Sequence, residues 1–320
     1  MNSIAPIEVR PVAPRHPAPA PALSIAIVSY RRADDLRLCL EDLAAQLTGL
    51  AFEVVLVLQA YPAGVADEIA RIYRDRLNLR IHEFANGLGV HGARNAALKF
   101  IRAPIVTFFD DDIRVGPNWV ETLMPYFDDR EVGGVGGFVE YPGCRRLSAR
   151  LLRPMLGLAS SRFRIDWGGF HTLPCYSHPL DDQPADWLCG CNMSYRVEAL
   201  VQAGEFDDAY GNYGYDDVDI GVRVRRAGWK MLTSRRLAVV HNVSPVNRPS
   251  PMDFVREEEA RRVLLVRKAI GHLSFWRQRY LLRMSFHLFA TFIQGLGRGR
   301  PQLVLGAAAG ARRGLARYGN

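Results

Sequence analysis

Short apolar segments alternate with helical patterns through the first third of this 320-residue chain. The runs at residues 23–30, 52–58 and 103–109 are rich in β-branched and aromatic side chains, which is typical of buried strands. Helical spacing of apolar residues follows the first run, a second helical pattern covers roughly residues 65–76, and residues 79–82 are a candidate for a short third strand. This alternation predicts an α/β fold with a doubly wound, mostly parallel sheet.

Three consecutive acids, Asp110, Asp111 and Asp112, directly follow the apolar run at residues 103–109. In open α/β sheets, ligands bind at the carboxyl ends of the strands. Carboxylates crowded at that position repel one another unless a cation or a shifted pKa compensates their charge. They suit a hard divalent cation, Mg²⁺ or Mn²⁺, held together with substrate phosphates. Taken alone, these three acids are equally compatible with a solvated acidic loop or with a helix N-cap before Pro117.

Further motifs stand in a definite order around the acidic strand end. A Gly-rich turn that contains Gly92-Ala93-Arg94-Asn95 precedes it, and the segment at residues 187–193, which contains a Cys-Gly-Cys-Asn stretch, follows it. Acids at residues 204–219 and a histidine, His241, after an apolar strand complete the series. With the first strand, which ends in Val28-Ser29-Tyr30-Arg31-Arg32, these motifs resemble the family-2 nucleotide-sugar glycosyltransferases, which have the GT-A fold. The resemblance covers about residues 23–243.

The resemblance implies roles for individual residues. Asp112 is the first choice for direct contact with the metal, Asp110 would reach the metal or the ribose, and a neutral His241 would complete the protein's share of the coordination. Asp217 occupies the position of the family's general base. The nucleotide sugar donor would be bound by Ser29, Tyr30, Arg31, Gln59, Gly92, Arg94, Asn95, Asp110, Asp111, Trp187, Gly190 and Asn192.

Two positions depart from the family pattern. The family usually ends its second strand with an Asp that contacts the nucleoside, whereas this chain has Gln59, and Asp216 replaces the Glu of the usual Glu-Asp pair. For Arg94, a contact with the donor diphosphate and a structural role are equally compatible with the sequence. Acids in the first turn of a helix are also favourable for its macrodipole. We expect Asp217 to face the cleft and Asp219 to be structural.

The two ends of the chain differ from the domain between them. Residues 1–22 are rich in Pro and Ala, which predicts a disordered or extended tail. Residues 23–250 are expected to form the catalytic domain, with residues 141–186 as a variable region on the acceptor side. Residues 251–320 carry 13 Lys and Arg but only 4 Asp and Glu, a net charge of +9 in a chain whose total is +8. The basic charge is therefore local, which gives no support to a nucleic-acid partner.

The basic segment at residues 251–320 interleaves arginines with large apolar side chains such as Trp276, Phe286, Phe289 and Phe292. This composition suits a helix lying in the interface of an anionic membrane, and equally a helical appendage packed on the catalytic domain. No apolar run approaches the roughly 18–20 residues that a transmembrane helix needs, and no secretory signal is recognisable. We expect a cytoplasmic protein, either free or peripheral on the inner face of the cell membrane.

The five cysteines do not suggest a disulfide framework, because their number is odd and Cys189 and Cys191 lie too close for a standard bridge. Their spacing does not match a zinc site, so reduced packing residues are the favoured interpretation.

The sequence thus predicts a metal-dependent inverting glycosyltransferase with Mg²⁺ or Mn²⁺ as cofactor. Its donor would be a nucleotide diphosphate sugar, and its acceptor a saccharide or lipid-linked saccharide of the cell envelope, the latter inferred only from the basic segment. A metal-dependent nucleotidyltransferase and a catalytically degenerate GT-A scaffold at a membrane are the alternatives. The missing acid at Gln59 slightly favours the scaffold, whereas the set Asp110, Asp112, Asp217 and His241 argues against it.

Overall fold

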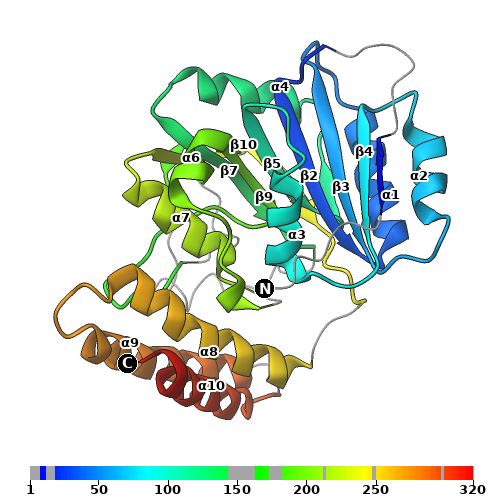
Figure 1. Cartoon of the computed structure of the whole chain (residues 1–320). Coiled ribbons are helices and arrows are strands. Elements are labelled where there is room, and N and C mark those ends of the chain that lie inside the picture. Colours follow the sequence, from blue (N-terminus) through cyan, green and yellow to red (C-terminus); the bar gives the residue numbers. More distant parts are fainter. Residues whose placement is uncertain are drawn as a thin grey trace.

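The computed structural model describes residues 8–11, 19–142, 163–172, 182–211, 214–246, 250–296 and 299–319. A ten-stranded mixed sheet lies at the centre, in the order β1-β4-β3-β2-β5-β9-β7-β10-β6, with β8 paired to β10 (Figure 1). The strands are β1 (Glu8–Pro11), β2 (Leu23–Tyr30), β3 (Phe52–Gln59), β4 (Leu79–Phe84), β5 (Ile105–Asp110), β6 (Ile113–Val115), β7 (Val132–Glu140), β8 (Gln183–Pro184), β9 (Asn192–Arg196) and β10 (Lys230–His241). Most of the region predicted at residues 141–186 lies outside the described residues.

Strands β4, β3, β2 and β5 are parallel neighbours, joined by the first three helices. The helices of the catalytic part are α1 (Ala33–Ala44), α2 (Val65–Tyr73), α3 (Gly89–Leu98), α4 (Trp119–Leu123), α6 (Val197–Ala203) and α7 (Asp216–Arg226), with short 3-10 helices at Met124–Asp128 and Asp208–Tyr210. The predicted α/β class is confirmed. Strand β4 runs beyond the predicted residue 82 to Phe84, and helix α2 ends at Tyr73, before the predicted residue 76.

The other half of the sheet brings distant residues to the carboxyl end of β5. Strand β9 runs antiparallel to β5 and pairs Asn192 with Phe109, so the segment before β9 passes next to the acidic strand end. Strand β6 runs antiparallel to β10 and pairs Ile113 with His241. The register therefore places His241 beside Asp112.

The amino-terminal segment is not wholly without structure. Residues 8–11, within the tail predicted to be disordered or extended, form the edge strand β1, which pairs antiparallel with β4.

Helices cover both faces of the sheet, because alternate strand residues point to opposite sides. On one face, Ile25 and Ile27 of β2 pack with Leu40 of α1 and Ile69 of α2. On the other face, Ala26 packs in a cluster that includes residues of α3, α6 and α7, and this side carries the Asp216–Asp219 acids at the start of α7.

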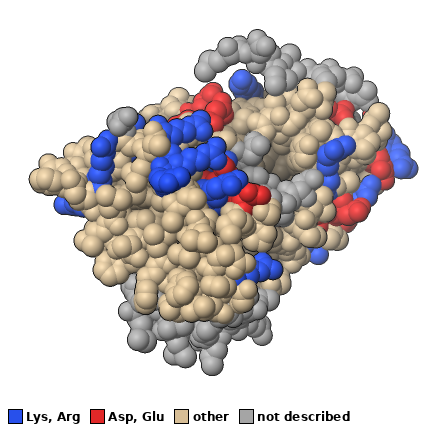
Figure 2. Space-filling model, turned by 90° about the horizontal axis from the view of Figure 1, so that it is seen from below, with Lys and Arg blue, Asp and Glu red and all other residues tan. Residues whose placement is uncertain are grey.

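Three carboxyl-terminal helices, α8 (Pro251–Ile270), α9 (Trp276–Leu296) and α10 (Leu303–Tyr318), pack together below the sheet in Figure 1. Figure 2 looks onto this side of the molecule and shows many Lys and Arg side chains there. Helix α8 contacts α7, and its Leu265 joins the apolar cluster of the catalytic part. The basic segment is thus packed on the α/β domain. Among the residues that the structure describes, no helix is long and apolar enough to cross a bilayer.

Candidate active site

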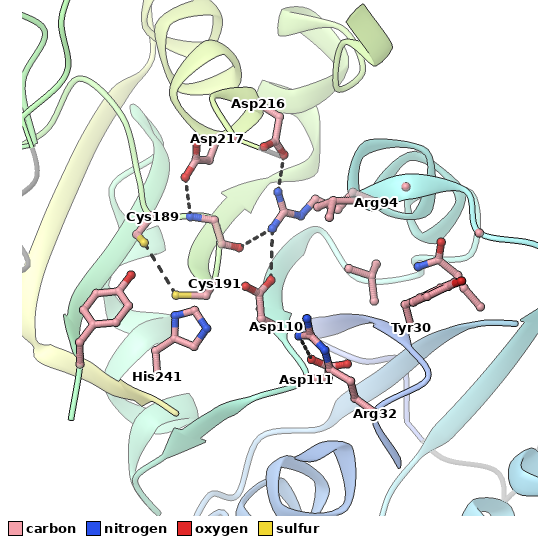
Figure 3. A pocket seen from close by; sticks show the side chains of 18 residues that line it. Tyr30, Arg32, Arg94, Asp110, Asp111, Cys189, Cys191, Asp216, Asp217 and His241 are labelled. Atoms are coloured by element: carbon pink, nitrogen blue, oxygen red, sulfur yellow. Dashed lines mark hydrogen bonds and ion pairs between the residues drawn. The ribbon is translucent and has the colours of Figure 1, made fainter. Parts of the chain in front are cut away.

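A cavity of about 670 Å³ opens at the carboxyl ends of β2, β3 and β5, between the start of α3 and the start of α7. Eight residues predicted from the sequence line it: Tyr30, Gln59, Arg94, Asp110, Asp111, Gly190, Asp217 and His241 (Figure 3). The position agrees with the general rule that ligands of open α/β sheets bind at the carboxyl ends of the strands.

Asp110, Asp112 and His241 form a potential metal site, since one ligand atom from each lies within 4.8 Å of the others. Nε2 of His241 lies 2.9 Å from Oδ1 of Asp112. Two atoms that both carry lone pairs stay this close only with a proton or a cation between them. Carboxylate oxygens suit Mg²⁺ and Mn²⁺, so the residues present fit such an ion.

The surroundings favour the charged forms of both Asp112 and His241. Burial opposes ionisation of Asp112, but contacts with His241, the Ser244 backbone N–H and Arg32 outweigh it and hold the pKa of Asp112 below its usual value. Burial likewise lowers the pKa of His241, but its contact with Asp112 and the charge of Asp110 outweigh that effect and raise it. Asp112 is therefore held in the ionised form that binds a cation.

Asp111 differs from its two neighbours. It accepts a hydrogen bond from the Ser29 hydroxyl and pairs with Arg32 at 3.2 Å, and burial raises its pKa to about 7. The guanidinium of Arg32 also lies 3.3 Å from Asp112. Arg32 thus compensates part of the charge at the acidic strand end.

Arg94 is buried and connects the two acidic parts of the cavity. Its guanidinium pairs with Asp216 at the start of α7 and lies 3.3 Å from Asp110. These contacts outweigh the cost of burial and raise the pKa of Arg94. The charge of Arg94, together with His91, in turn holds the pKa of Asp216 well below its ordinary value despite burial. These contacts give Arg94 a structural role within the protein. Its side chain also lines the cavity, so a contact with the donor diphosphate stays a prediction.

Asp217 faces the cavity, and its pKa is raised, whereas that of Asp216 is lowered. Burial, followed by the negative charge of Asp216, raises its pKa to about 7. Its Oδ2 accepts a hydrogen bond of 2.9 Å from the backbone N–H of Gly190, whose carbonyl accepts one from Arg94 (Figure 3). Asp219 is turned to Arg223 and Lys268, in keeping with the expected structural role.

Gly190 leaves little room for a side chain in this arrangement. A Cβ atom there would lie 3.0 Å from a guanidinium nitrogen of Arg94 and 3.2 Å from Oδ2 of Asp217. Any side chain would therefore press on both groups.

The sequence model of the family described as Glycosyl transferase family 2 matches residues 24–200, which is more than half of the chain. The chain belongs to glycosyl transferase family 2. Its GT-A fold is shared with a mannosyltransferase from Pyrobaculum calidifontis solved with GDP-Man and Mn²⁺. That likeness has a TM-score of 0.59 at 16% identity and covers 98% of this chain and 90% of the other.

Curated relatives of this family 2 chain are distant. It is 26% identical over 232 residues to a validoxylamine A glucosyltransferase of Streptomyces hygroscopicus subsp. jinggangensis, a match covering 67% of this chain and 54% of the relative. It is 23% identical over 240 residues to a hyaluronan synthase of Pasteurella multocida, a match covering 70% of this chain and 25% of the synthase. The chain thus spans about half or less of the length of these relatives.

Several residues that the family 2 resemblance assigned to donor binding have other contacts. Asn95 exchanges hydrogen bonds with the backbone of Phe206, and Asn192 donates to the carbonyl of Leu237. Trp187 is buried against Phe163 and His171. The described cavity lining also does not include Ser29, Arg31, Gly92 or Asp112. The predicted donor contacts of these residues, and the predicted metal contact of Asp112, stay predictions.

Some residues of the family 2 site were missed from the sequence. Arg32 lines the cavity where Arg31 was expected, because Arg31 adopts a positive φ of 55° that turns the chain after β2. Nothing in the sequence indicates which of these two adjacent arginines lines the cavity. Tyr141, whose ring centroid lies 5.3 Å from that of His241, and the thiols Cys189 and Cys191 also line the cavity. Nothing in their spacing marked them as site residues.

Proposed function

We propose that this chain is a metal-dependent inverting glycosyltransferase that moves a sugar from a nucleotide diphosphate sugar to a saccharide or lipid-linked acceptor. The observation that carries the proposal is the pair of chemical centres in one cavity. Asp110 and His241 line one wall, with a ligand atom of Asp112 within 4.8 Å of theirs, and the carboxyl of Asp217, with its raised pKa, lies on another.

A divalent cation held by Asp110, Asp112 and His241 would stabilise the charge that develops on the diphosphate leaving group. The mannosyltransferase of the same fold was solved with Mn²⁺, which supports this choice of ion. The bond from the anomeric carbon to the phosphate oxygen breaks as the acceptor oxygen bonds to that carbon.

Asp217 takes the proton that the acceptor hydroxyl loses in this step. General bases work best when their pKa lies near the working pH, and burial together with Asp216 brings Asp217 to about 7. The N–H of Gly190 fixes the orientation of the carboxyl. A single base facing the acceptor fits direct displacement, which inverts the anomeric configuration.

The nucleoside would lie at the end of the cavity formed by Tyr30, Gln59 and Gly87. Oε1 of Gln59 accepts a hydrogen bond of 2.7 Å from the backbone N–H of Leu88, which leaves the amide NH₂ group as the donor for a base. An aspartate at this position could only accept. Gln59 in place of the usual Asp therefore predicts a preference for nucleobases that present a hydrogen-bond acceptor, such as a carbonyl, at this position.

The test is transfer itself. The chain should release a nucleoside diphosphate from a nucleotide sugar when Mn²⁺ and a suitable saccharide or lipid-linked saccharide are present. The anomeric configuration of the product, followed by NMR at early times, should be opposite to that of the donor. Retention would overturn the inverting mechanism, and release of inorganic diphosphate would indicate nucleotidyl transfer instead.

Asp112→Asn is expected to remove the Mn²⁺-dependent part of nucleoside diphosphate binding, because the amide brings no negative charge to the ion. In wild type, a ligand at about a hundred times its Kd stabilises the fold by roughly 2.7 kcal/mol, which a thermal-shift assay detects readily. The comparison is the melting temperature with a nucleoside diphosphate, with and without Mn²⁺, across a panel of bases.

Asp34→Asn is the matched control, since the Asp34 side chain is 97% exposed on α1. It should keep the full Mn²⁺-dependent shift. An equal shift in Asp112→Asn and wild type would show that the metal assignment is wrong.

A further inference from the structure

Helix α9 exposes large apolar side chains on the side that faces away from the protein. Leu282, Phe286 and Phe289 have 56%, 59% and 58% of their surface exposed, whereas Tyr280 and Met284 are buried against the neighbouring helices. A surface helix normally has one apolar face, directed to the core. Single exposed apolar side chains are common, but a contiguous row on one helix marks a docking surface.

The exposed residues form one row, which we call the α9 stripe: Leu281, Leu282, Phe286, Phe289, Phe292 and Leu296. With about 3.6 residues per turn, they fall on one side of the helix over its whole length. The same geometry places Arg277 and Arg279, both exposed, on the two margins of the stripe at its amino-terminal end. The arrangement is an apolar centre with basic edges.

Charge on this part of the chain has a single sign. The last acid in the sequence is Glu259, and residues 260–320 contain 12 Lys and Arg and no Asp or Glu. Arg300, Arg312 and Arg317 are exposed in addition to the two arginines beside the stripe. Figure 2 shows a broad area of uncharged side chains on this side of the molecule, with Lys and Arg and a few Asp and Glu gathered along one margin. The surface thus offers apolar and cationic groups together.

We propose that the α9 stripe docks on a bilayer that contains anionic lipid, with the helix lying flat in the interface. Its Leu and Phe side chains would enter the boundary between headgroups and acyl chains, and the flanking arginines would pair with lipid phosphates. This surface is separate from the cavity and does not depend on the proposed reaction.

The charge pattern disfavours a second copy of this chain as the occupant. A symmetric dimer through the α9 stripe would bring the same surface of both copies together. The arginines of two copies would then approach one another with no carboxylate from α9 or α10 to compensate them. A bilayer with anionic headgroups supplies both the apolar layer and the compensating charge.

The test is co-sedimentation of the full chain with vesicles of phosphatidylcholine, with or without phosphatidylglycerol. The full chain should sediment with the anionic vesicles at low salt and less at high salt, because salt screens the attraction. The double variant Phe286→Ser/Phe289→Ser should have a partition coefficient for these vesicles that is lower by about tenfold or more, since burial of each Phe favours the membrane.

The matched control is Leu47→Ser/Val201→Ser, because these apolar residues are 65% and 75% exposed elsewhere on the chain. This control should sediment like wild type. The proposal is overturned if the full chain stays in the supernatant with anionic vesicles at low salt, or if the stripe variant sediments as well as the control. A concentration-dependent dimer that only the stripe variant loses, without vesicle binding, would assign the stripe to self-association.

Discussion

Asp217→Asn is expected to lower the transfer rate by about 10²-fold or more, the usual contribution of a general base, while donor binding is kept. Asparagine can still accept the hydrogen bond from Gly190, but it cannot take a proton from the acceptor hydroxyl. Initial rates with saturating donor, together with a thermal shift by donor and Mn²⁺, separate the loss of chemistry from a loss of binding.

Asp208→Asn is the control, since this exposed acid of the same region is not part of the cavity lining that the structure describes. It should transfer at the wild-type rate. Near-normal transfer by Asp217→Asn, with Asp216→Asn inactive, would move the role of base by one residue.

The raised pKa of Asp217 also predicts how rate and stability depend on pH. The base acts in its deprotonated form, so the rate should rise as pH passes through about 7. The contribution of Asp217 to stability changes with pH in the opposite direction to the rate. A carboxyl whose pKa is higher in the folded chain contributes stability below its unfolded pKa of 3.8 and loses that contribution as pH rises towards 7. Asp217→Asn should therefore melt at a higher temperature than wild type at pH 8, and the difference should shrink at pH 5.

Arg262→Met is expected to reduce the free energy of unfolding by about 3–5 kcal/mol, the scale for breaking a buried ion pair. Arg262 of α8 donates to both carboxylate oxygens of Glu259, at 2.7 and 3.0 Å, and both side chains are almost fully buried. The arginine also lies over the rings of Phe170 and Tyr215. Its positive charge is part of what keeps the pKa of Glu259 at about 2 despite burial. Urea unfolding at neutral pH measures the loss.

The same substitution at Arg256 is the matched control. Arg256 pairs with Asp253 on the same helix, but the two side chains are 44% and 52% exposed, so the change should cost less than about 1 kcal/mol. Equal small losses for the two variants would show that the ion pair of Arg262 and Glu259 contributes little to stability.

The position of Arg262 also explains why the basic segment cannot be treated as a detachable tail. Tyr215, which directly precedes the acids of α7, has its ring under Arg262 and donates a hydrogen bond to Glu258. Helix α8 thereby supports the turn that presents Asp217. The sequence left packing on the domain and membrane contact as equal alternatives, and the structure shows the first while the second stays a proposal.

The sequence was informative where a motif has a fixed place in the fold. The apolar run before Asp110 had to be a central strand, and its carboxyl end had to open onto the ligand side of the sheet. The sequence was uninformative where the role of a residue depends on contacts with side chains that are distant in the sequence. The partners of Arg94 are Asp216, far along the chain, and Asp110, and no local spacing reveals this pairing.

Helix phase explains why Arg94 and Asn95, which are neighbours in one motif, have different surroundings. Asn95 follows Arg94 directly, yet a step of about 100° turns its side chain from the cavity to Phe206. A motif therefore identifies a segment of the site more reliably than it identifies each contact within it.

The peptide of Gly190 has a practical consequence for anyone who wishes to change the substrate range of this protein. Its N–H donates to Asp217 and its carbonyl accepts from Arg94, so we expect substitutions at Cys189 and Cys191, which line the cavity on either side of it, to disturb the proposed base as well. At the other end, Gln59 is tied to the backbone of Leu88 on a separate turn. With the nucleoside at the proposed end of the cavity, we expect changes at Gln59 to leave the proposed base undisturbed, whereas changes beside Gly190 should affect it.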